Sequence, residues 1–351
     1  MNSINQNIIA YRGLLDDSGC SLSGRVLGRP LLPDPGEHDT WWDNLVNAYR
    51  RFDSERIPGV RVVASFRGQQ AEAVSDQDGY YNIRLPVAQP AGTILWDTAQ
   101  VSCDGKEPVF LQPVLCVPRT ARFGVISDID DTVLESNITH WQTAVKLTFL
   151  HNARTRKPLE GVAKLYKAFQ NGRDGHGPNP VFYVSASPWN LYDLLEDFID
   201  LNGVPQGPIL LRDVDFERAS LSMDAGTRGK LDSMHGLIDR YPGLQWVLMG
   251  DSGQIDAELY VDTVRKYPGR ILAVYIRDVD PVLDSPRDKF VDTQLKRIAG
   301  TGVPMLRVTD SNAIAAHARE LGLIEAEEIA EVARDVKRDK SLPETKVAAA
   351  P

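Results

Sequence analysis

The chain has 351 residues, of which 42% are hydrophobic, 25% charged and 8% aromatic, and its formal net charge is −9. This composition excludes an intrinsically disordered chain and is sufficient for one large core or two modest ones. The acidic balance argues against a general nucleic-acid binder, and no stretch reaches the roughly 20 apolar residues of a membrane-spanning helix.

Residues 1–19 lack a basic start followed by a sustained apolar segment, so we predict an N-terminal extension and no export signal. The chain has an odd number of cysteines, without C-x-x-C spacing: Cys20, Cys103 and Cys116. This set fits neither a disulfide framework nor a structural zinc site. We therefore expect a cytoplasmic protein, with peripheral contact at a membrane surface left open.

Residues 20–118 carry short β-rich runs separated by turn residues such as Asp78-Gly79, which predict a small antiparallel β-sandwich. The runs that predict strands are 60–64, 80–85 and 93–96. Helical spacing of apolar residues predicts a helical insertion at 40–51. The run SDQDGYYNIRLPV resembles the last part of transthyretin-like or carboxypeptidase-regulatory β-sandwiches, and we use it only to predict the fold.

After residue 118 the pattern changes to apolar strands that alternate with longer amphipathic stretches, so we set a domain boundary there. This alternation predicts an α/β domain over 119–325, with a parallel sheet covered by helices on both faces. The predicted strands are 123–127, 181–184, 209–211, 246–249, 271–275 and 305–308. Residues 326–351 are expected to form one charged helix and a frayed tail.

The strand 123–127 runs into a cluster of acidic residues, Asp128-Ile129-Asp130-Asp131-Thr132. We expect these carboxylates at the carboxyl edge of a parallel sheet, where sites in α/β proteins form. Clustered like charges are tolerated when a divalent cation neutralises them, and hard oxygen ligands point to Mg²⁺. The alternatives are an acidic solvent turn and a calcium loop, which would need Gly where Val133 stands.

A second acidic motif, Gly250-Asp251-Ser252-Gly253 with Asp256 further on, follows the strand 246–249. Two acids at a second strand end suit the same metal ion. Gly-Asp-Ser-Gly also occurs in the nucleophile loop of serine proteases, but the Gly-Pro that follows there is missing and the setting is an α/β pattern. The structural alternative for Asp256 is a helix N-cap.

Two further residues lie between these motifs. Ser185 stands at the end of the predicted strand 181–184, directly after its last residue, and Lys230 is the first residue of a predicted helix over 230–241. A hydroxyl at a strand end and an ammonium at a helix start can both hold phosphate oxygens. Each residue taken alone would be read as an ordinary surface residue. Together with the two acidic motifs they form an ordered set at four element ends.

The ordered motifs D-x-D-x-T, Ser, Lys and G-D-x-x-x-x-D resemble those of the haloacid dehalogenase superfamily of phosphohydrolases. The strings SDIDDTV, YVSASPWNLYDLL, YPGLQWVLMGDSGQIDAELY and YIRDV are similar, more narrowly, to the actin-patch-associated phosphatidate phosphatase family. The resemblance covers about residues 119–325. It implies a haloacid dehalogenase-like Rossmannoid sheet without a large cap, and hydrolysis of phosphatidate to diacylglycerol.

The resemblance also implies the roles of the motif residues. Asp128 would attack phosphorus to form an aspartyl-phosphate, and Asp130 would protonate the leaving oxygen and later activate water. Ser185 and Lys230 would hold the phosphoryl group.

The metal assignment follows from the same resemblance. Mg²⁺ would be held by the carboxylates of Asp128 and Asp251 and the backbone carbonyl of Asp130, with Asp256 in support. Asp131 is left off this set.

The intervals 133–180 and 188–229 are too short for a separate cap domain, which predicts an open site suited to a bulky or membrane-embedded substrate. The segment 138–150 has an apolar helical face, which either dips into anionic lipid or packs on the sheet. Candidate substrate contacts are Ser187 and the basic residues Arg154, Arg156 and Lys157.

Three other functions remain compatible with these motifs. The same chemistry could act on a soluble or protein phosphomonoester. A phosphate-sensing adaptor without activity would not need the full set of motif residues. A receiver domain phosphorylated on aspartate would share the metal and the phosphoacceptor but would not need Asp130.

Overall fold

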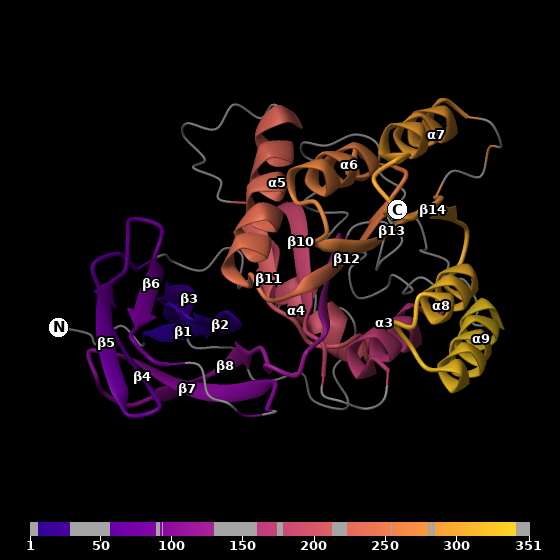
Figure 1. Cartoon of the computed structure of the whole chain (residues 1–351). Coiled ribbons are helices and arrows are strands. Elements are labelled where there is room, and N and C mark those ends of the chain that lie inside the picture. Colours follow the sequence, from indigo (N-terminus) through magenta and orange to yellow (C-terminus); the bar gives the residue numbers. More distant parts are fainter. Residues whose placement is uncertain are drawn as a thin grey trace, which may run out of the picture. The chain divides into compact units, whose positions relative to one another are not determined.

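The computed structural model describes residues 6–28, 57–88, 92, 94–129, 160–173, 178–212, 223–253, 255–279, 282 and 285–341. The chain divides into two compact units (Figure 1). The first consists of Met1–Arg119 with two short segments, Asn190–Asp193 and Gly207–Ile209, and the second contains the remaining residues from Thr120 onward. The helix predicted at 40–51 lies outside the described residues.

The described part of the first unit forms an eight-stranded sheet with the order β1-β3-β2-β8-β7-β4-β5, and β6 pairs with β3. Its strands are β1 (Asn7–Ala10), β2 (Gly13–Asp16), β3 (Gly19–Leu27), β4 (Arg61–Phe66), β5 (Gln69–Val74), β6 (Tyr80–Leu85), β7 (Trp96–Cys103) and β8 (Val109–Cys116). The pairings are antiparallel except for the parallel pair β2–β8.

Two of the predicted strands of the first unit, 60–64 and 80–85, correspond to β4 and β6. The prediction of a strand at 93–96 was wrong in position, because β7 only begins at Trp96. A β-sandwich has two separate sheets, whereas the described strands of this unit belong to one hydrogen-bonded sheet. In β6, Tyr81, Ile83 and Leu85 are buried while the residues between them are exposed, the alternation of a strand with one face on a core.

The three cysteines all lie buried in the first unit, and none of them forms a disulfide. Burial raises the pKa of the Cys20 thiol to about 12 and that of the Cys103 thiol to about 11. These thiols therefore stay protonated and behave as small apolar core residues.

The described part of the second unit contains a six-stranded sheet with the order β11-β10-β9-β12-β13-β14. Its strands are β9 (Phe123–Ser127), β10 (Val181–Pro188), β11 (Ile209–Arg212), β12 (Gln245–Asp251), β13 (Ile271–Arg277) and β14 (Met305–Val308). The ladders from β10 through β9, β12 and β13 to β14 are all parallel. The predicted parallel sheet is thus confirmed, and a strand lies at each of the six predicted positions. The prediction that the second strand ends at Ser185 was wrong, because β10 continues to Pro188.

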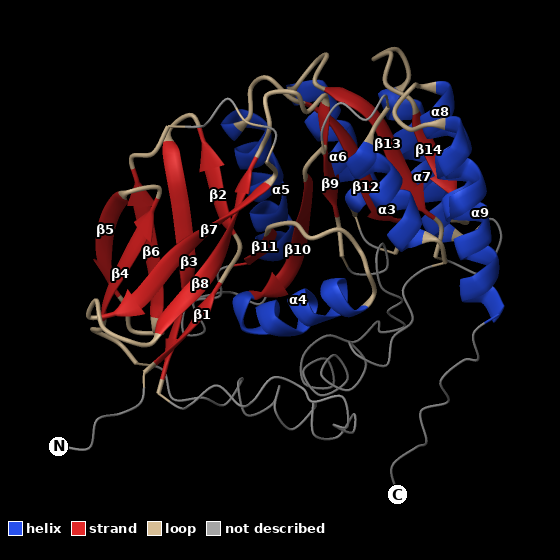
Figure 2. Cartoon of the chain, turned by 90° about the horizontal axis from the view of Figure 1, so that it is seen from below, coloured by secondary structure: helices blue, strands red, loops and turns tan. Residues whose placement is uncertain are grey.

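Helices cover both faces of this sheet, which is why its strands read as nearly continuous apolar runs. The helices are α3 (Val162–Asn171), α4 (Tyr192–Leu201), α5 (Met223–Arg240), α6 (Asp256–Lys266), α7 (Pro286–Ile298), α8 (Ser311–Glu320) and α9 (Ala326–Ser341), with the short 3₁₀ helix η1 (Trp189–Leu191). Helices α5, α6 and α7 lie on one face, and α3, α8 and α9 on the other (Figure 1, Figure 2).

The strand order reverses between β9 and β12. From β9 the chain adds β10 and β11 on one side, and it then returns to add β12, β13 and β14 on the other. In open α/β sheets, ligands bind outside the carboxyl ends of the strands at such a switch point. The fold therefore directs attention to the ends of β9 and β12.

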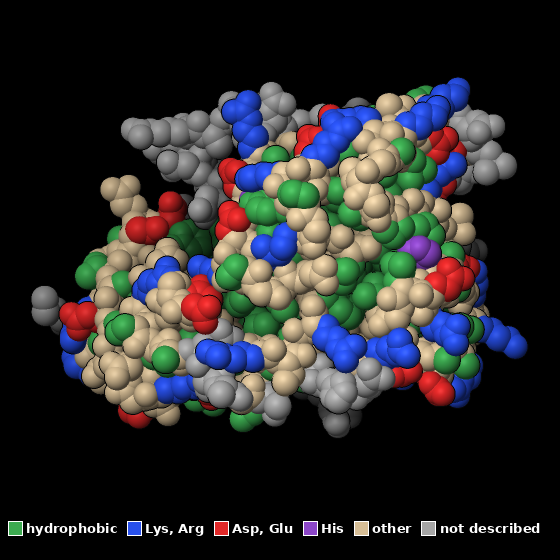
Figure 3. Space-filling view, in the orientation of Figure 1, with side chains coloured by type: hydrophobic (Ala, Val, Ile, Leu, Met, Phe, Trp, Pro, Cys, Tyr) green, Lys and Arg blue, Asp and Glu red, His purple; other side chains and the backbone are tan. Residues whose placement is uncertain are grey.

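The surface offers few further cues to function. On the face drawn in Figure 3, the coloured side chains mix Lys and Arg with Asp and Glu. Within the described ranges, no helix is both long and apolar enough to cross a bilayer. The predicted apolar segment 138–150 lies outside these ranges.

Candidate active site

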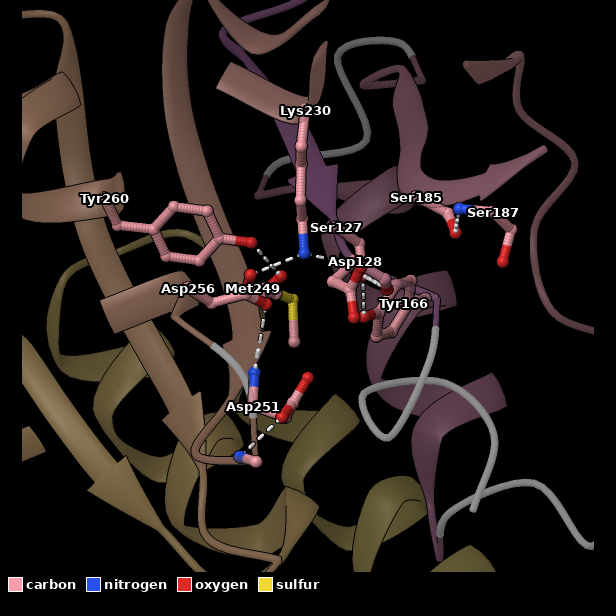
Figure 4. A network of polar contacts seen from close by, with 11 residues as sticks. Ser127, Asp128, Tyr166, Ser185, Ser187, Lys230, Met249, Asp251, Asp256 and Tyr260 are labelled. Atoms are coloured by element: carbon pink, nitrogen blue, oxygen red, sulfur yellow. Dashed lines mark hydrogen bonds and ion pairs between the residues drawn. The ribbon is translucent and has the colours of Figure 1, made fainter. Parts of the chain in front are cut away.

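Three carboxylates meet at the switch point, and we call them the carboxylate cluster: Asp128, Asp251 and Asp256 (Figure 4). Asp128 follows β9, Asp251 is the last residue of β12, and Asp256 begins α6. The three side chains are at most 1% exposed, and each offers an oxygen within 4.8 Å of the others. The two acidic motifs of the sequence therefore form a single buried site.

Gly250 allows the first turn of α6 to approach the end of β12. A Cβ atom at this position would lie 2.5 Å from Asp256 Oδ2, which is closer than real contacts allow. Asp256 Oδ2 accepts a hydrogen bond from the Asp251 amide at 3.4 Å, and Asp251 Oδ1 accepts one from the Gly253 amide at 2.6 Å. The alternative of an N-cap role for Asp256 was wrong, because the N-cap is Ile255.

Lys230 supplies a buried positive charge to the cluster. Its Nζ lies 2.7 Å from Asp128 Oδ1 and 2.5 Å from Asp256 Oδ1, and the side chain is only 3% exposed. Burial alone would lower the pKa of this ammonium, but the surrounding carboxylates, led by Asp128 and Asp256, raise it well above its ordinary value. Lys230 is therefore expected to be charged at neutral pH.

The prediction that Lys230 opens a helix was wrong, because α5 already begins at Met223. Lys230 lies in the interior of that helix. Its charge is held by its two carboxylate partners and not by a helix end.

The donor set of the carboxylate cluster is compatible with a divalent cation. It consists of oxygen ligands only, the type preferred by hard cations such as Mg²⁺ and Mn²⁺. When ionised, the three carboxylates carry three negative charges, and the Lys230 ammonium compensates one of them. A divalent cation would neutralise the two that remain, in a place where water cannot.

The predicted serines lie at the same sheet edge, on β10, which neighbours β9 on the side away from β12. The register pairs Tyr183 with Ser127, so Ser185 extends beyond the end of β9 as Asp128 and Ile129 do. Ser185 and Ser187 are both buried, and Ser185 Oγ accepts a hydrogen bond from the Ser187 amide at 2.9 Å. Figure 4 shows the two serines apart from the carboxylate cluster, on the side where Asp128 lies.

The remaining predicted site residues lie outside the described part of the chain. They are Asp130, Arg154, Arg156 and Lys157. The predicted acid–base residue and the predicted basic cluster therefore stay predictions.

The turn that follows Asp251 is tied to the end of β13. The Ser252 amide donates to the Arg277 carbonyl at 2.8 Å, and Ser252 Oγ accepts from the Val279 amide at 3.1 Å. Asp278 in turn forms an ion pair with Arg307 of β14 at 3.3 Å. These contacts connect the turn to β13 and, through Asp278, to β14.

Two tyrosines and a serine escaped the sequence analysis. Tyr166 Oη lies 2.6 Å from Ser127 Oγ, and Tyr260 Oη donates to the Met249 carbonyl at 2.7 Å. Tyr166 lies among the apolar residues of α3, where spacing predicts only a core residue. Tyr260 ends the string GDSGQIDAELY, so its position within one of the strings that resemble the phosphatase family was the one available signal.

Comparison with known proteins agrees with the position of this site. Residues 123–278 match the family model described as "Phosphatidate phosphatase APP1, catalytic domain". The chain is 33% identical over 155 residues to phosphatidate phosphatase APP1 of Saccharomyces cerevisiae, and 31% identical over 169 residues to the uncharacterized protein C29B5.04c of Schizosaccharomyces pombe. These regions cover 44% and 46% of this chain but 25% and 26% of the relatives, so the chain matches about a quarter of their length.

Similarity to solved structures is weak. The carbohydrate acetylesterase XAC1771 from Xanthomonas citri is 13% identical, with a TM-score of 0.34 over 88% of this chain and 72% of that one. A β-D-glucuronidase for Dictyoglomus thermophilum is 10% identical, with a TM-score of 0.19 over 78% of this chain and 43% of that one. Neither value is high enough to establish a common fold.

Proposed function

We propose that the chain, whose residues 123–278 match the family model of the APP1 phosphatidate phosphatase catalytic domain, hydrolyses phosphatidate to diacylglycerol and phosphate. The observation that carries this proposal is the buried carboxylate cluster with Lys230 at the switch point of the sheet. The cluster lies within the matched region. Its charged groups are those that phosphoryl transfer requires: a nucleophile, a cation site and a fixed positive charge.

Asp128 is the proposed nucleophile. Its carboxylate attacks phosphorus, a new P–O bond forms to Asp128, and the bond to the glycerol oxygen breaks. Asp130 gives its proton to that oxygen as it leaves, then takes a proton from the water that attacks the aspartyl-phosphate. This step restores both carboxyl groups and releases phosphate.

Lys230 and Ser185 are the proposed phosphoryl contacts. The Lys230 ammonium already touches Asp128, so it can stabilise negative charge that develops on the phosphoryl oxygens beside that residue. It needs no reorganisation to do so, because it is held from both sides by carboxylates. Ser185, on the neighbouring strand, supplies a hydroxyl group at the same edge.

Asp128, Asp251, Asp256 and the carbonyl of Asp130 are the proposed Mg²⁺ ligands. When bound, the ion would supply positive charge to the phosphate oxygens and orient the ester. Three of these residues form the carboxylate cluster.

We also propose that the second unit is a sheet of the haloacid dehalogenase type. Its strand order and the position of Asp128 after β9 support this assignment. The proposal includes a cytoplasmic location with peripheral contact at a lipid surface, where phosphatidate resides. The free, buried thiols suit a reducing compartment.

The test measures phosphate release from phosphatidate in mixed micelles and from a panel of soluble phosphomonoesters, with and without Mg²⁺. We expect Mg²⁺-dependent turnover that favours phosphatidate and falls at least about 10³-fold in Asp128→Asn. Asp339→Asn is the matched control, since it neutralises another buried aspartate outside the cluster. Preference for a soluble ester would overturn the lipid assignment, and hydrolysis of no ester would leave the adaptor function as the better reading.

A further inference from the structure

Two fully buried tyrosines reach the carboxyl end of β9 from opposite faces of the sheet (Figure 4). Tyr166 belongs to α3 and Tyr260 to α6, and these helices lie in different layers (Figure 1). Both hydroxyl groups enter hydrogen-bond chains that end on the backbone of Asp128.

The first chain ends on the carbonyl of Asp128. Ser127 Oγ donates to the Asp128 carbonyl at 2.6 Å, and Tyr166 Oη lies 2.6 Å from the same Ser127 Oγ. A serine hydroxyl has one hydrogen, and here the carbonyl takes it. The Tyr166 hydroxyl must therefore be the donor, so the chain runs from Tyr166 through Ser127 to Asp128.

The second chain ends on the amide of Asp128. This amide donates to the Met249 carbonyl at 2.9 Å, and the Tyr260 hydroxyl donates to the same carbonyl at 2.7 Å. A carbonyl oxygen has two lone pairs, and each donor can use one of them. The acceptor that holds the Asp128 amide is thus itself held from α6.

Both tyrosines remain protonated donors. Burial raises the pKa of the Tyr166 and Tyr260 hydroxyls above their ordinary value, and the charges of Asp256 and Asp128 raise that of Tyr260 further. The direction of the two chains is therefore the same throughout the physiological pH range.

We propose that Tyr166 and Tyr260 are positioning residues that fix the backbone of Asp128 from the two faces of the sheet and thereby aim its carboxylate. This inference rests on the proposed function, in which Asp128 is the nucleophile. A reacting carboxylate must be held within a fraction of an ångström, and a displacement of about 1 Å can cost about 10²-fold in rate. Two chains on one residue meet that requirement at the end of β9, where the bond to Met249 of β12 holds the Asp128 amide and the chain through Ser127 holds the Asp128 carbonyl.

The kinetic test compares Tyr166→Phe and Tyr260→Phe with Tyr183→Phe. Tyr183 is an equally buried tyrosine of β10, and its hydroxyl donates to the Pro205 carbonyl at 2.6 Å. We expect kcat to fall about 10-fold in each of the first two variants with KM unchanged, and both constants to stay at the wild-type value in the control. Equal kcat in all three variants would overturn the inference.

A double-mutant cycle tests the first chain as a unit. Because Tyr166 acts on Asp128 through Ser127, the variant Ser127→Ala should lose as much kcat as Tyr166→Phe does. The double variant should lose no more than either single one. Independent, multiplicative losses would show that the two hydroxyls do not act in series.

Hydrogen exchange separates failure of this inference from failure of the proposed function, because it needs no substrate. The measurement follows, by mass spectrometry, the amides of the peptide that covers 123–129. We expect faster exchange there in Tyr166→Phe and Tyr260→Phe, and wild-type exchange in Tyr183→Phe. Unchanged exchange in all three variants contradicts the inference even if the wild type proves to be a phosphatase. Faster exchange in a protein that hydrolyses no phosphomonoester would support the inference and reject the function.

Discussion

Two sets of buried carboxylates in the second unit differ in where their cation lies. The carboxylate cluster, Asp128, Asp251 and Asp256, surrounds the ammonium of Lys230, which is 3% exposed. The pair on α9, Asp335 and Asp339, is bound by Arg338, whose side chain is 61% exposed and lies 2.6 and 2.8 Å from the two carboxylates. One set has its cation in the interior, and the other has it at the surface.

This difference distinguishes a pair of carboxylates with a structural role from a cluster that is suited to bind a ligand. On α9, the Asp339 carboxylate also accepts the Gly161 amide at 2.9 Å, so the pair joins α9 to the start of α3. When ionised, the carboxylate cluster leaves more negative than positive charge in the interior, which costs stability unless a ligand balances it. Such an excess is compatible with the binding of a divalent cation.

Removal of each cation gives the largest expected contrast in stability. Lys230→Met leaves three buried carboxylates without a counter-charge, so we expect the free energy of unfolding to fall by about 3–5 kcal/mol. Arg338→Met removes an exposed cation and should cost at most about 1 kcal/mol. Urea denaturation measures the loss in free energy of unfolding for both variants. Equal losses would contradict the distinction between the two sets of carboxylates.

A divalent cation should change the stability of the two variants differently. If the cluster binds Mg²⁺, adding the ion should recover part of the stability that Lys230→Met loses, and none of what Arg338→Met loses. Recovery in both variants, or in neither, would argue against a cation site at the cluster.

Glycine substitutions test the close approach that builds the cluster. Gly250→Ala places a Cβ atom 2.5 Å from Asp256 Oδ2, so we expect a stability loss of about 1–3 kcal/mol and a reduced kcat. Gly236→Ala adds a Cβ atom to α5 where nothing lies within 4 Å, and helix propensity predicts a gain of up to about 1 kcal/mol. Thermal unfolding measures the melting temperature of each variant. A shift of both melting temperatures in the same direction would contradict the account.

The smallest expected effect is a pH dependence on α9. Burial, together with the charge of Asp339, raises the pKa of the Asp335 carboxyl above its ordinary value. The folded state therefore binds this proton more readily than the unfolded state, so the Asp335 contribution to stability decreases as the pH rises from the unfolded pKa through the raised folded one.

Asp335→Asn removes that decrease. We expect the variant to be more stable than the wild type at pH 7, by no more than about 1 kcal/mol, and the gain to vanish in acid. Urea denaturation between pH 4 and pH 7 measures the difference. A gain in stability of the variant over the wild type that grows as the pH falls would contradict the account.

The parallel sheet was predictable because its buried strands are continuous apolar runs. The stretch Trp246 to Met249 illustrates this, and the acids after it then had to lie at the sheet edge. The start of α5 was not predictable. Gly226 and Gly229 are poor helix formers, so local propensity predicts that the helix starts after them, at Lys230. In the structure the helix continues through both glycines.

Other features depend on contacts between elements distant in sequence. Strand β3 carries polar residues among apolar ones, and besides its neighbours β1 and β2 it pairs with β6, more than fifty residues away. The hydroxyls of Tyr166 and Tyr260 gain a role only when α3 and α6 pack against the sheet. Spacing along the chain predicts the packing of their rings but not the bonds of their oxygens.

The most direct test of the central claim is to identify the residue that carries the phosphoryl group during turnover. Enzyme quenched during hydrolysis of phosphatidate would be treated with borohydride, which reduces an aspartyl-phosphate to homoserine, and mapped by mass spectrometry. The account predicts homoserine at position 128 in the wild type and none in Asp128→Asn. Phosphatidate hydrolysis without this product, or with the phosphoryl group on another residue, would contradict it.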